Sequence, residues 1–505
     1  MKRSFLVVIA FALALGLLPV SAPERALADV DSRPLEPQAG SWRTYVLSSG
    51  AEIPVPPPPG NGSLATAAEL QELLTLQAQR TPAILAAINF WNDSPAFKRW
   101  TERELGLIST RGTNTTRAQR NLALVHAAVY DAVIATWHWK YTYHRPDPTK
   151  LNDSLLSAVP LPLHPSYPSE HAAIAGAASR VLAHLYPLDA AALEAEEVQA
   201  MNSRLQAGTN YRSDVVAGQA LGRAVADAVI ARRGPAVDGS NLVWDGTGQL
   251  TGPPGSGFWE RTAPAFAFPP TTPLAGNWRT WVIPSTGAYL SPPPPGFTAG
   301  PPASINVSVL LPEAQSVMDQ VALTRALDAE GARRRGVIAV WGGVPGNRWN
   351  RIALDLMVGE QLNLPRAARV AASVNTAGAD AIYVPWKTKY TYWTARPQTI
   401  IRQYLDPTGT WLSFRPTPPD PAYSSGLSTV SGAVSEVLAF YFPSAAGAVR
   451  AQAFDAMQSR LYDGSHWGFD NQAGYAAGTA MAPQFIGRAL NDGAAPTAAS
   501  SRRRS

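Results

Sequence analysis

The chain has 505 residues, too many for one ordinary hydrophobic core, and its 46% hydrophobic and 16% charged content is typical of a globular protein. It contains no cysteine, which excludes disulfides, thiolate metal sites and cysteine nucleophiles. The formal net charge is +5 and falls to +3 without residues 1–28. That bias is too weak to indicate a nucleic acid or an anionic membrane as a partner.

Residues 1–28 resemble an export signal. The basic residues Lys2 and Arg3 precede the apolar stretch FLVVIAFALALGLL, and the ALA sequence at 26–28 is a plausible cleavage site. An uncleaved anchor helix is the alternative, but the stretch is short for a bilayer span. No later segment is apolar enough to cross a membrane. We therefore expect a secreted, periplasmic or extracellular protein without a membrane span after signal removal.

Proline-rich stretches interrupt the sequence at two places. PVPPPPG ends at Gly60, and GPPGSG, FPPTTP and SPPPPGFTAGPP lie within 252–302. We interpret both regions as linkers or surface coil. Between them, alanine- and leucine-rich segments repeat apolar residues at steps of three and four, which predicts helices. Convincing strand-type alternation is absent, so the predicted fold class is mainly α.

The sequence repeats itself. SYPSEHAAIAGAASRVLAHLYP (166–187) aligns without a gap to AYSSGLSTVSGAVSEVLAFYFP (422–443), an offset of 256 that the segments starting at 203 and 459 also keep. Upstream, DAVIATWHWKYTYHRP matches DAIYVPWKTKYTYWTARP, and FWNDSPAFKRW resembles VWGGVPGNRW. One spacing shared by separate blocks indicates an internal duplication, with each copy predicted to be a helical bundle.

These boundaries predict six parts of the chain. They are a signal peptide at 1–28, a linker with a first helix at 29–79, a first helical repeat at 80–235, a proline- and glycine-rich connector at 236–324, a second repeat at 325–490 and a disordered tail at 491–505.

The second repeat contains a set of residues suited to an anion. Lys389 and Arg396 are seven residues apart, so two turns of a helix would place both on one face, and Pro397 would stop or kink that helix. The SSG turn at 424–426 would open a helix whose N-terminal N–H groups attract negative charge. Taken singly, a Lys or Arg is usually a solvated charge and a Ser before a helix is usually an N-cap.

A second cluster follows about 35 residues later. Arg460, Gly464 and His466 form an Arg-x-x-x-Gly-x-His array, with Asp470 four residues after the histidine. Guanidinium and ammonium groups, a hydroxyl and free N–H groups together suit a tetrahedral oxyanion. A histidine held by a carboxylate could act as a nucleophile or as a metal-oxyanion ligand. A lone histidine is more often structural, but His466 is the only one in the second repeat.

These motifs, in this order, resemble those of the superfamily of vanadium-dependent haloperoxidases and type 2 phosphatidic acid phosphatases (PAP2). The resemblance implies helical bundles that bind vanadate or phosphate. It implies that the oxyanion is held by Lys389, Arg396, Ser425, Gly426 and Arg460. It further implies that His466 bonds to the vanadium of vanadate or attacks phosphorus, and that Asp470 orients it. Vanadate is the only cofactor implied.

Each repeat departs from the family pattern at a different place. The first repeat's counterparts of the site are Lys140, Arg145, Ser169, His171, Arg204 and Asn210. Its Asn210 stands at the nucleophile position and cannot act as an imidazole does. Its Lys140 and Arg145 are only five apart, which would spoil a shared helical face. The second repeat has Leu427 in place of the acid–base histidine, with Asp463 as one candidate substitute.

Three functions stay open at this point. A secreted haloperoxidase would oxidise halide with peroxide, an acid phosphatase would form a phosphohistidine at His466, and a degenerate protein would bind an oxyanion without turnover. The long two-bundle architecture favours the haloperoxidase branch. In a further variant, the repeats pack so that His171 reaches the pocket of His466. The expected partner is a small molecule rather than a nucleic acid, and the protein could be a monomer or a homodimer.

Overall fold

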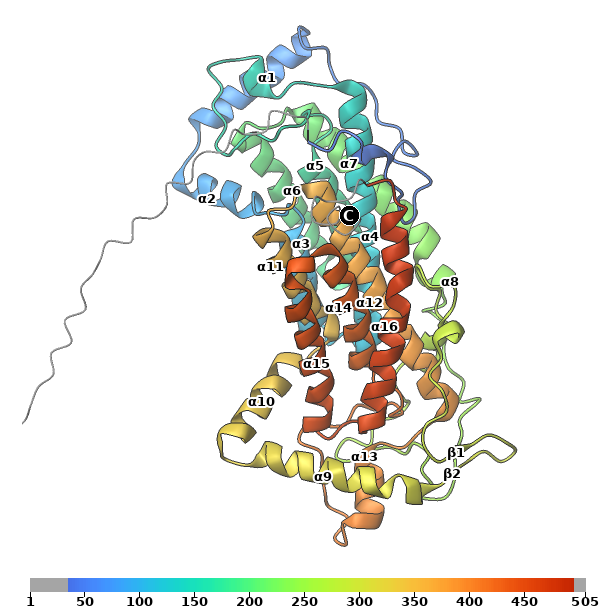
Figure 1. Cartoon of the computed structure of the whole chain (residues 1–505). Helices are drawn as coiled ribbons and strands as arrows, with labels where there is room; N and C mark the ends of the chain where they lie inside the picture. The colour runs from blue at the N-terminus through green and yellow to red at the C-terminus, as the bar shows by residue number, and fades with distance from the viewer. Residues whose placement is uncertain (1–34, 495–505) are drawn as a thin grey trace, which may run out of the picture. The chain divides into compact units, whose positions relative to one another are not determined.

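The computed structural model describes residues 35–494, which are mostly helical (Figure 1). The mainly α fold predicted from the sequence is confirmed. The predicted signal peptide and the chain after residue 494 lie outside the described residues. Within 35–494, no helix combines the length and the apolar content needed to cross a bilayer.

The helices follow one another in two matching series. The first series has a 3₁₀ turn η1 (Ala39–Ser41), α1 (Leu64–Ala78), α2 (Pro82–Trp91), α3 (Lys98–Thr110), α4 (Thr115–Tyr143), α5 (Glu170–Leu185), α6 (Ala190–Ala207) and α7 (Arg212–Arg233), followed by the short α8 (Pro235–Asp238). The second has η4 (Pro273–Asn277), α9 (Leu311–Arg325), α10 (Ala329–Trp341), α11 (Pro345–Gly359), α12 (Leu364–Tyr392), α13 (Pro397–Ile400), α14 (Gly426–Tyr441), α15 (Ala446–Tyr462) and α16 (Gly468–Leu490). Two short strands, β1 (Phe297–Thr298) and β2 (Ser304–Ile305), pair antiparallel. We refer to residues 35–233 as the first half and residues 271–490 as the second half.

The long helices α4 and α12 begin and end in the same way. Each has 29 residues and starts after an asparagine, Asn114 or Asn363, whose side chain accepts a backbone N–H of the first turn. Each ends at a residue in the left-handed conformation, His144 with φ 51° and Trp393 with φ 53°. Equivalent local sequences therefore produce helices of equal length.

Two buried aspartates fasten the segment that precedes each bundle. Asp131 on α4 accepts the backbone N–H groups of residues 45–47 at 2.7–2.9 Å. Asp380 on α12 accepts those of residues 281–283 at 2.7–3.1 Å. The segments held in this way read AGSWRTYVL (39–47) and AGNWRTWVI (275–283), a likeness that the sequence comparison above did not use.

The proline-rich stretches lie against the helices in both halves. The Tyr143 hydroxyl donates to the Val55 carbonyl at 2.6 Å, and the Tyr392 hydroxyl donates to the Ser291 carbonyl at 3.2 Å. The region predicted as a connector, 236–324, also contains helix α9. These stretches are largely coil, as expected, but they pack against the helices of each half rather than forming free linkers.

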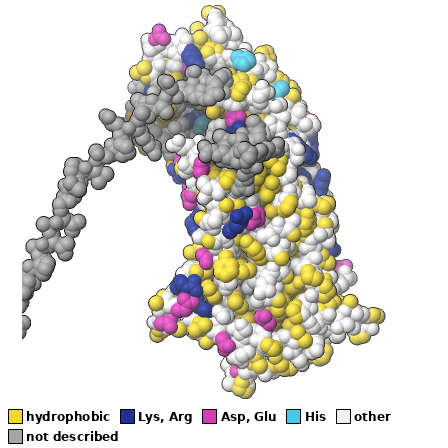
Figure 2. Space-filling model, viewed as in Figure 1, with side chains coloured by type: hydrophobic (Ala, Val, Ile, Leu, Met, Phe, Trp, Pro, Cys, Tyr) yellow, Lys and Arg dark blue, Asp and Glu magenta, His cyan; other side chains and the backbone are white. Residues whose placement is uncertain are grey.

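The two halves share one hydrophobic core. Helices α4 and α12 pack along each other, and buried aromatic residues from both, such as Trp137 and Tyr383, belong to the same cluster. The start of α4 lies beside the end of α12, since Thr115 and Lys389 line one cavity, so the two helices run antiparallel. On the face in view in Figure 2, charged side chains of both signs are scattered, without a large field of one sign.

Candidate functional site

A cavity of about 350 Å³ lies in the second half, where α12, α14 and α15 end or begin. Its wall includes Lys389, Arg396, Gly426, Arg460 and His466, which the sequence placed in one site. The start of α4, residues 113–115, closes the cavity from the first half. The structure thus brings together most of the residues that the resemblance implied.

The lysine and the arginine reach the cavity from different elements. Lys389 is in the last turn of α12, where its ammonium donates to the carbonyl oxygens of Pro421 and Ala422. Arg396 is not on that helix, because α12 has already ended at Tyr392. The expectation that both share one helical face is therefore wrong, and Pro397 begins the short helix α13 instead of stopping α12.

Lys389 and Arg396 meet on a carboxylate that the sequence analysis did not consider. The Oδ1 atom of Asp420 lies 2.9 Å from Lys389 Nζ and 2.7 Å from Arg396 Nη2. The backbone oxygen of Asp420 also accepts Arg396 Nε at 2.7 Å. All three side chains are buried. An internal carboxylate is therefore already paired with both cations that would hold an oxyanion.

His466 is fixed by two partners in a defined tautomer. Its Nε2 atom lies 3.0 Å from Arg396 Nη1, and its Nδ1 atom lies 2.9 Å from Asp470 Oδ2. Because a guanidinium can only donate, Nε2 is the acceptor and Nδ1 carries the proton. Burial, with Arg396 and Lys389 nearby, holds the pKa of His466 well below its usual value. The imidazole is neutral, and its one lone pair points at Arg396.

Burial also moves the pKa values of the groups around the histidine. It raises the pKa of Asp470 to about 7, although Lys389 and Arg396 oppose that shift. It lowers the pKa of Lys389 to about 8, against the attraction of Asp420. Both shifts follow from the cost of holding a charge away from water.

The first turn of α14 forms another part of the cavity wall. Ser425 is the N-cap, and its hydroxyl oxygen accepts the Ser428 N–H at 3.4 Å and the Ser428 hydroxyl at 3.0 Å. The N–H groups of Gly426 and Leu427 donate to no other residue within 35–494, as expected for a helix start. The buried Leu427 side chain lines the cavity and has no group that could donate a proton.

Arg460 and Asp463 pair with each other in the same cavity. Arg460 Nη1 donates to Asp463 Oδ2 at 3.0 Å, and Nη2 donates to the Trp341 carbonyl at 2.8 Å. The other oxygen of Asp463 accepts the Ser465 N–H at 2.8 Å. Both oxygens of Asp463 are thus engaged, which argues against it as the substitute acid–base group.

The first half has its own cavity, of about 210 Å³, which shares no lining residue with the other. Glu170, His171, Arg204 and Asn210 line it. His171 therefore lies in a different pocket from His466, and the packing variant that would bring it there is wrong. Its Nδ1 atom lies 3.0 Å from Glu170 Oε1.

Lys140 of α4 makes the same contacts as Lys389. Its ammonium donates to the Pro165 and Ser166 carbonyls at 2.6 and 3.1 Å and lies 2.9 Å from Glu170 Oε2. The carboxylate comes from a different position, because Glu170 aligns with Gly426 while Asp420 aligns with His164. Each half has thus placed a carboxylate of its own beside the lysine.

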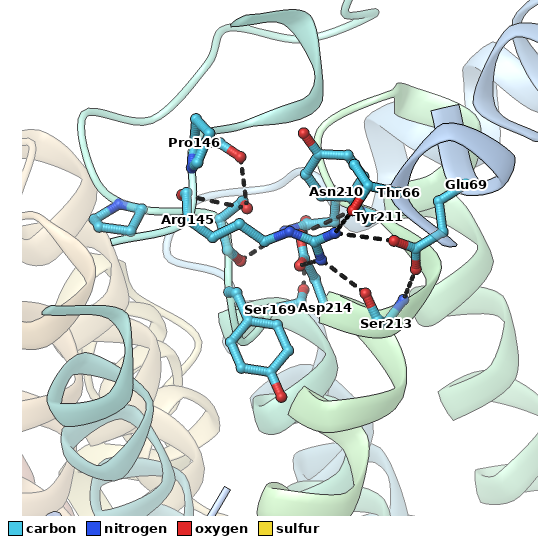
Figure 3. Close-up of polar contacts among 12 residues, drawn as sticks. Thr66, Glu69, Arg145, Pro146, Ser169, Asn210, Tyr211, Ser213 and Asp214 are labelled. Atoms are coloured by element: carbon cyan, nitrogen blue, oxygen red, sulfur yellow. Dashed lines mark hydrogen bonds and ion pairs between the residues drawn. The ribbon is translucent and has the colours of Figure 1, made fainter. Parts of the chain in front are cut away.

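Arg145 is not among the residues that line the first cavity and instead reaches Glu69, Ser213 and Asp214 (Figure 3). It donates to Asp214 Oδ1 at 2.7 Å and to Glu69 Oε2 at 2.9 Å, with its guanidinium carbon 3.8 Å from the centre of the Tyr211 ring. Like Arg396, it follows the end of its long helix. Arg145 directly follows the C-cap residue His144, whereas Arg396 stands three residues after its C-cap residue, and the two arginines contact different partners.

The remaining predicted residues of the first half have structural partners. Asn210 donates to the Ser166 carbonyl at 3.1 Å and accepts from Ser169, which is the N-cap of α5. Arg204 donates to Asn92 Oδ1 at 2.9 Å. This cavity is lined by His164 and His171, but it has Asn210 at the position equivalent to His466, and Arg145 is not among its lining residues.

Comparison with known proteins agrees with the geometry. A family described as the VCPO second helical-bundle domain matches residues 369–454, which include Lys389 and Arg396. A bacterial vanadium-dependent iodoperoxidase is similar in structure, with a TM-score of 0.60 and 20% identity over 78% of this chain and 95% of its own. The chain has the fold of the vanadium haloperoxidase and PAP2-like superfamily.

Two further structures support this assignment, which confirms the family resemblance read from the sequence. The holo and apo forms of a bacterial vanadium-dependent chloroperoxidase each have a TM-score of 0.55, at 14% and 13% identity, over 75% of this chain and 93% and 94% of theirs. No curated protein matches the sequence. At these identities the likeness establishes the haloperoxidase-like fold. The activity has to be argued from the residues of the site.

Two residues of the second-half cavity were missed from the sequence. Asp420 stands in the loop PPDPAY, and Arg415 stands five residues before it. The guanidinium of Arg415 makes no hydrogen bond or ion pair among residues 35–494, although the Arg415 carbonyl oxygen accepts the Ser413 hydroxyl. A single sequence marks neither, because loop residues reach a site only through the fold.

Proposed function

We propose that the chain is a haloperoxidase-like protein with one oxyanion site, located in the second half, which binds vanadate or phosphate. The observation that supports it is the convergence of Lys389, Arg396 and the neutral His466 on one cavity beside the free N–H groups of α14. Ammonium, guanidinium and helix N–H donors are the groups that bind tetrahedral oxyanions. The carboxylates of Asp420 and Asp463 oppose an anion there, and Asp420 is the one that contacts Lys389 and Arg396.

The residues of the cavity have separate roles in this proposal. Lys389 and Arg396 balance the negative charge of the oxyanion. Asp470 holds the Nδ1 proton of His466, which leaves Nε2 as the atom facing vanadium or phosphorus once Arg396 turns toward the anion. Vanadate, when bound, supplies the activation of peroxide for halide oxidation. Leu427 supplies no proton, so we expect turnover to be slow and binding to be the firmer property.

The presence of Leu427 favours a second candidate, an oxyanion-binding protein without turnover. A positioned acid–base group is typically worth ~10²–10⁴ in rate, and no described residue of the cavity replaces it. An acid phosphatase acting through His466 is the third possibility.

We further infer that the two halves arose by duplication and that the protein is exported. The recurrence of the Asp131 and Asp380 contacts supports the first inference, because the same three N–H groups are held in each half. It extends each copy upstream of the predicted limits at residues 80 and 325. The basic and apolar pattern of residues 1–28 supports the second.

Binding measured with a matched pair of variants tests the oxyanion site. We expect the purified chain to bind one vanadate, followed by vanadium NMR, and Lys389→Met to abolish binding. Lys140→Met is the control, since Lys140 has the same helix position and the same carbonyl partners in the other half. Binding that survives Lys389→Met or disappears in Lys140→Met would overturn the proposal.

Activity assays separate the three functions. Halide oxidation that requires both vanadate and His466 supports the haloperoxidase, with His466→Ala as the test variant. Phosphate release that vanadate inhibits supports the phosphatase. Vanadate binding without either reaction supports the non-catalytic protein.

A further inference from the structure

The second-half cavity already contains an anion in the position that an oxyanion would take. Asp420 Oδ1 contacts both Lys389 Nζ and Arg396 Nη2, at 2.9 and 2.7 Å. Each cation is almost completely inaccessible to water, with side chains 1% exposed. A buried charge without a partner is costly, so the carboxylate stabilises the resting cavity.

In the first half, the buried lysine is also paired with a carboxylate, but that carboxylate comes from a different position. Lys140 is paired with Glu170 at 2.9 Å, and Glu170 is anchored on the first turn of α5 with His171 3.0 Å from its other oxygen. That carboxylate belongs to a helix and has partners on both oxygens. The buried lysine is therefore neutralised in both halves, but from different sequence positions.

Asp420 is held less completely than Glu170. It lies in a loop between α13 and α14, and both cations contact the same atom, Oδ1. Its Oδ2 atom makes no hydrogen bond among the described residues. The carboxylate can therefore leave by a side-chain rotation while the Asp420 backbone oxygen keeps its bond to Arg396.

A cation without a partner lines the same cavity. Arg415 stands five residues before Asp420 in the same loop. Its carbonyl oxygen accepts the Ser413 hydroxyl, but its guanidinium makes no hydrogen bond or ion pair with residues 35–494. A Cβ atom built on Gly342 would lie 2.2 Å from Arg415 Nη1, so the guanidinium rests against a glycine of the cavity wall. Arg415 is placed to accept a carboxylate that moves within the cavity.

We propose that Asp420 is a built-in competitor for the oxyanion, which binds by replacing the Asp420 carboxylate on Lys389 and Arg396 while Arg415 receives it. This inference rests on the proposed oxyanion site and adds its regulation. The resting pocket is closed to anions by one side chain. Affinity is then set by how readily Asp420 exchanges partners, and the first half, with Glu170 fixed, binds no oxyanion.

Titration calorimetry with inorganic phosphate tests the exchange. We expect Asp420→Asn to bind phosphate at least about tenfold more tightly than the natural chain, because a like charge within a few ångströms of the anion is removed. Glu170→Gln removes the equivalent charge in the first half and should leave binding unchanged. Equal affinity of the Asp420→Asn variant and the natural chain would overturn the inference while the oxyanion site stands.

The other outcomes also separate the two proposals. Phosphate binding by Asp420→Asn alone supports the competitor and overturns oxyanion binding by the natural chain. No binding by either protein overturns both. Arg415→Gln should weaken binding in the natural chain but not in the Asp420→Asn background, and equal weakening in both would overturn the role of Arg415.

A readout on the natural chain keeps the inference testable should Asp420→Asn fail to fold. A crystal structure with bound vanadate should show the Asp420 carboxylate away from Lys389 and near Arg415. An oxyanion bound while the ion pair of Asp420 with Lys389 stays intact would overturn the inference.

Discussion

The two halves of the molecule are built alike but their cavities are not equipped alike. Asp131 and Asp380 hold equivalent segments, and Lys140 and Lys389 donate to equivalent carbonyl oxygens. The groups that carry chemistry differ, since His466 in one half is Asn210 in the other. The contacts that fix the fold are therefore shared, whereas the reactive groups vary on that framework.

The arginines show how a site is lost while the fold is kept. Arg396 turns into its cavity and contacts Asp420 and His466, whereas Arg145 turns out to Asp214 and Glu69. Both follow the left-handed residue that ends a 29-residue helix. They differ in the carboxylates around them and in their place after the helix, since Arg145 directly follows His144 and Arg396 stands three residues after Trp393.

Leu427→His should have the largest effect, because it restores to the second half the acid–base histidine that the first half kept as His171. Provided that vanadate binds, we expect vanadate-dependent halide oxidation to rise by ~10²–10⁴, the usual worth of a positioned acid–base group. His171→Leu in the first half is the matched control and should not change the rate. An unchanged rate in Leu427→His would show that the cavity is disabled elsewhere, with Asp420 as the next position to alter.

Asp131→Ala and Asp380→Ala test whether the halves are equivalent as structures. Each leaves three backbone N–H groups without their acceptor, so we expect each to lower the free energy of unfolding by about 3–5 kcal/mol. The milder Asp131→Asn and Asp380→Asn variants keep one acceptor oxygen and should cost less. Urea unfolding measures these losses, and two very different losses would show that the halves contribute unequally to the shared core.

Arg396→Met and Arg145→Met separate binding from stability. Arg396→Met should weaken phosphate binding by roughly 100-fold, or about 2.7 kcal/mol, because a charge-assisted contact to the anion is lost. Arg145→Met should leave binding unchanged and lower stability, because it strands the carboxylates of Asp214 and Glu69. Calorimetry and urea unfolding of both variants provide the measurements. Loss of binding in Arg145→Met would place it in the site after all.

The sequence was sufficient to predict the helices, their N-caps and the residues that belong to short motifs. Helix periodicity predicted the mainly α fold, and the caps at Ser169 and Ser425 follow from serine before a helix. Lys389 and His466 were placed in one site through the family motifs, and the structure brings them together.

The sequence was not sufficient for contacts between distant segments. Three contacts depend on the course of loops. Arg396 reaches the cavity from a position after its helix, Asp420 pairs with Lys389 and Arg396, and Arg145 pairs with Glu69. The proline-rich stretches were taken for linkers because their partners, such as Tyr143 and Tyr392, are far away in the chain. The conformation of a loop is set by tertiary packing, and the periodicity of apolar residues in the sequence carries no information about it.

The smallest expected effect concerns Glu104, a buried carboxyl group that has no equivalent in the second half. Both of its oxygens are buried without a hydrogen-bond partner on α3, where the second half has the buried Ala353. Burial raises the pKa of Glu104 well above its usual value. In that case, as pH rises above about 4.5, the unfolded chain releases a proton that the folded chain retains, so stability falls.

Glu104→Met, which removes the ionisable group and keeps the volume, should therefore raise the free energy of unfolding at pH 7 by about 1–2 kcal/mol. The gain should shrink toward pH 4, where the natural carboxyl is protonated in both states. Ala353→Gly, on the equivalent turn of α11, carries no titratable group and should show a loss that does not depend on pH. Urea unfolding at pH 4, 5.5 and 7 measures both, and a pH-independent effect of Glu104→Met would mean that the carboxylate finds a partner in solution. The two halves would then differ less in their cores than in their cavities.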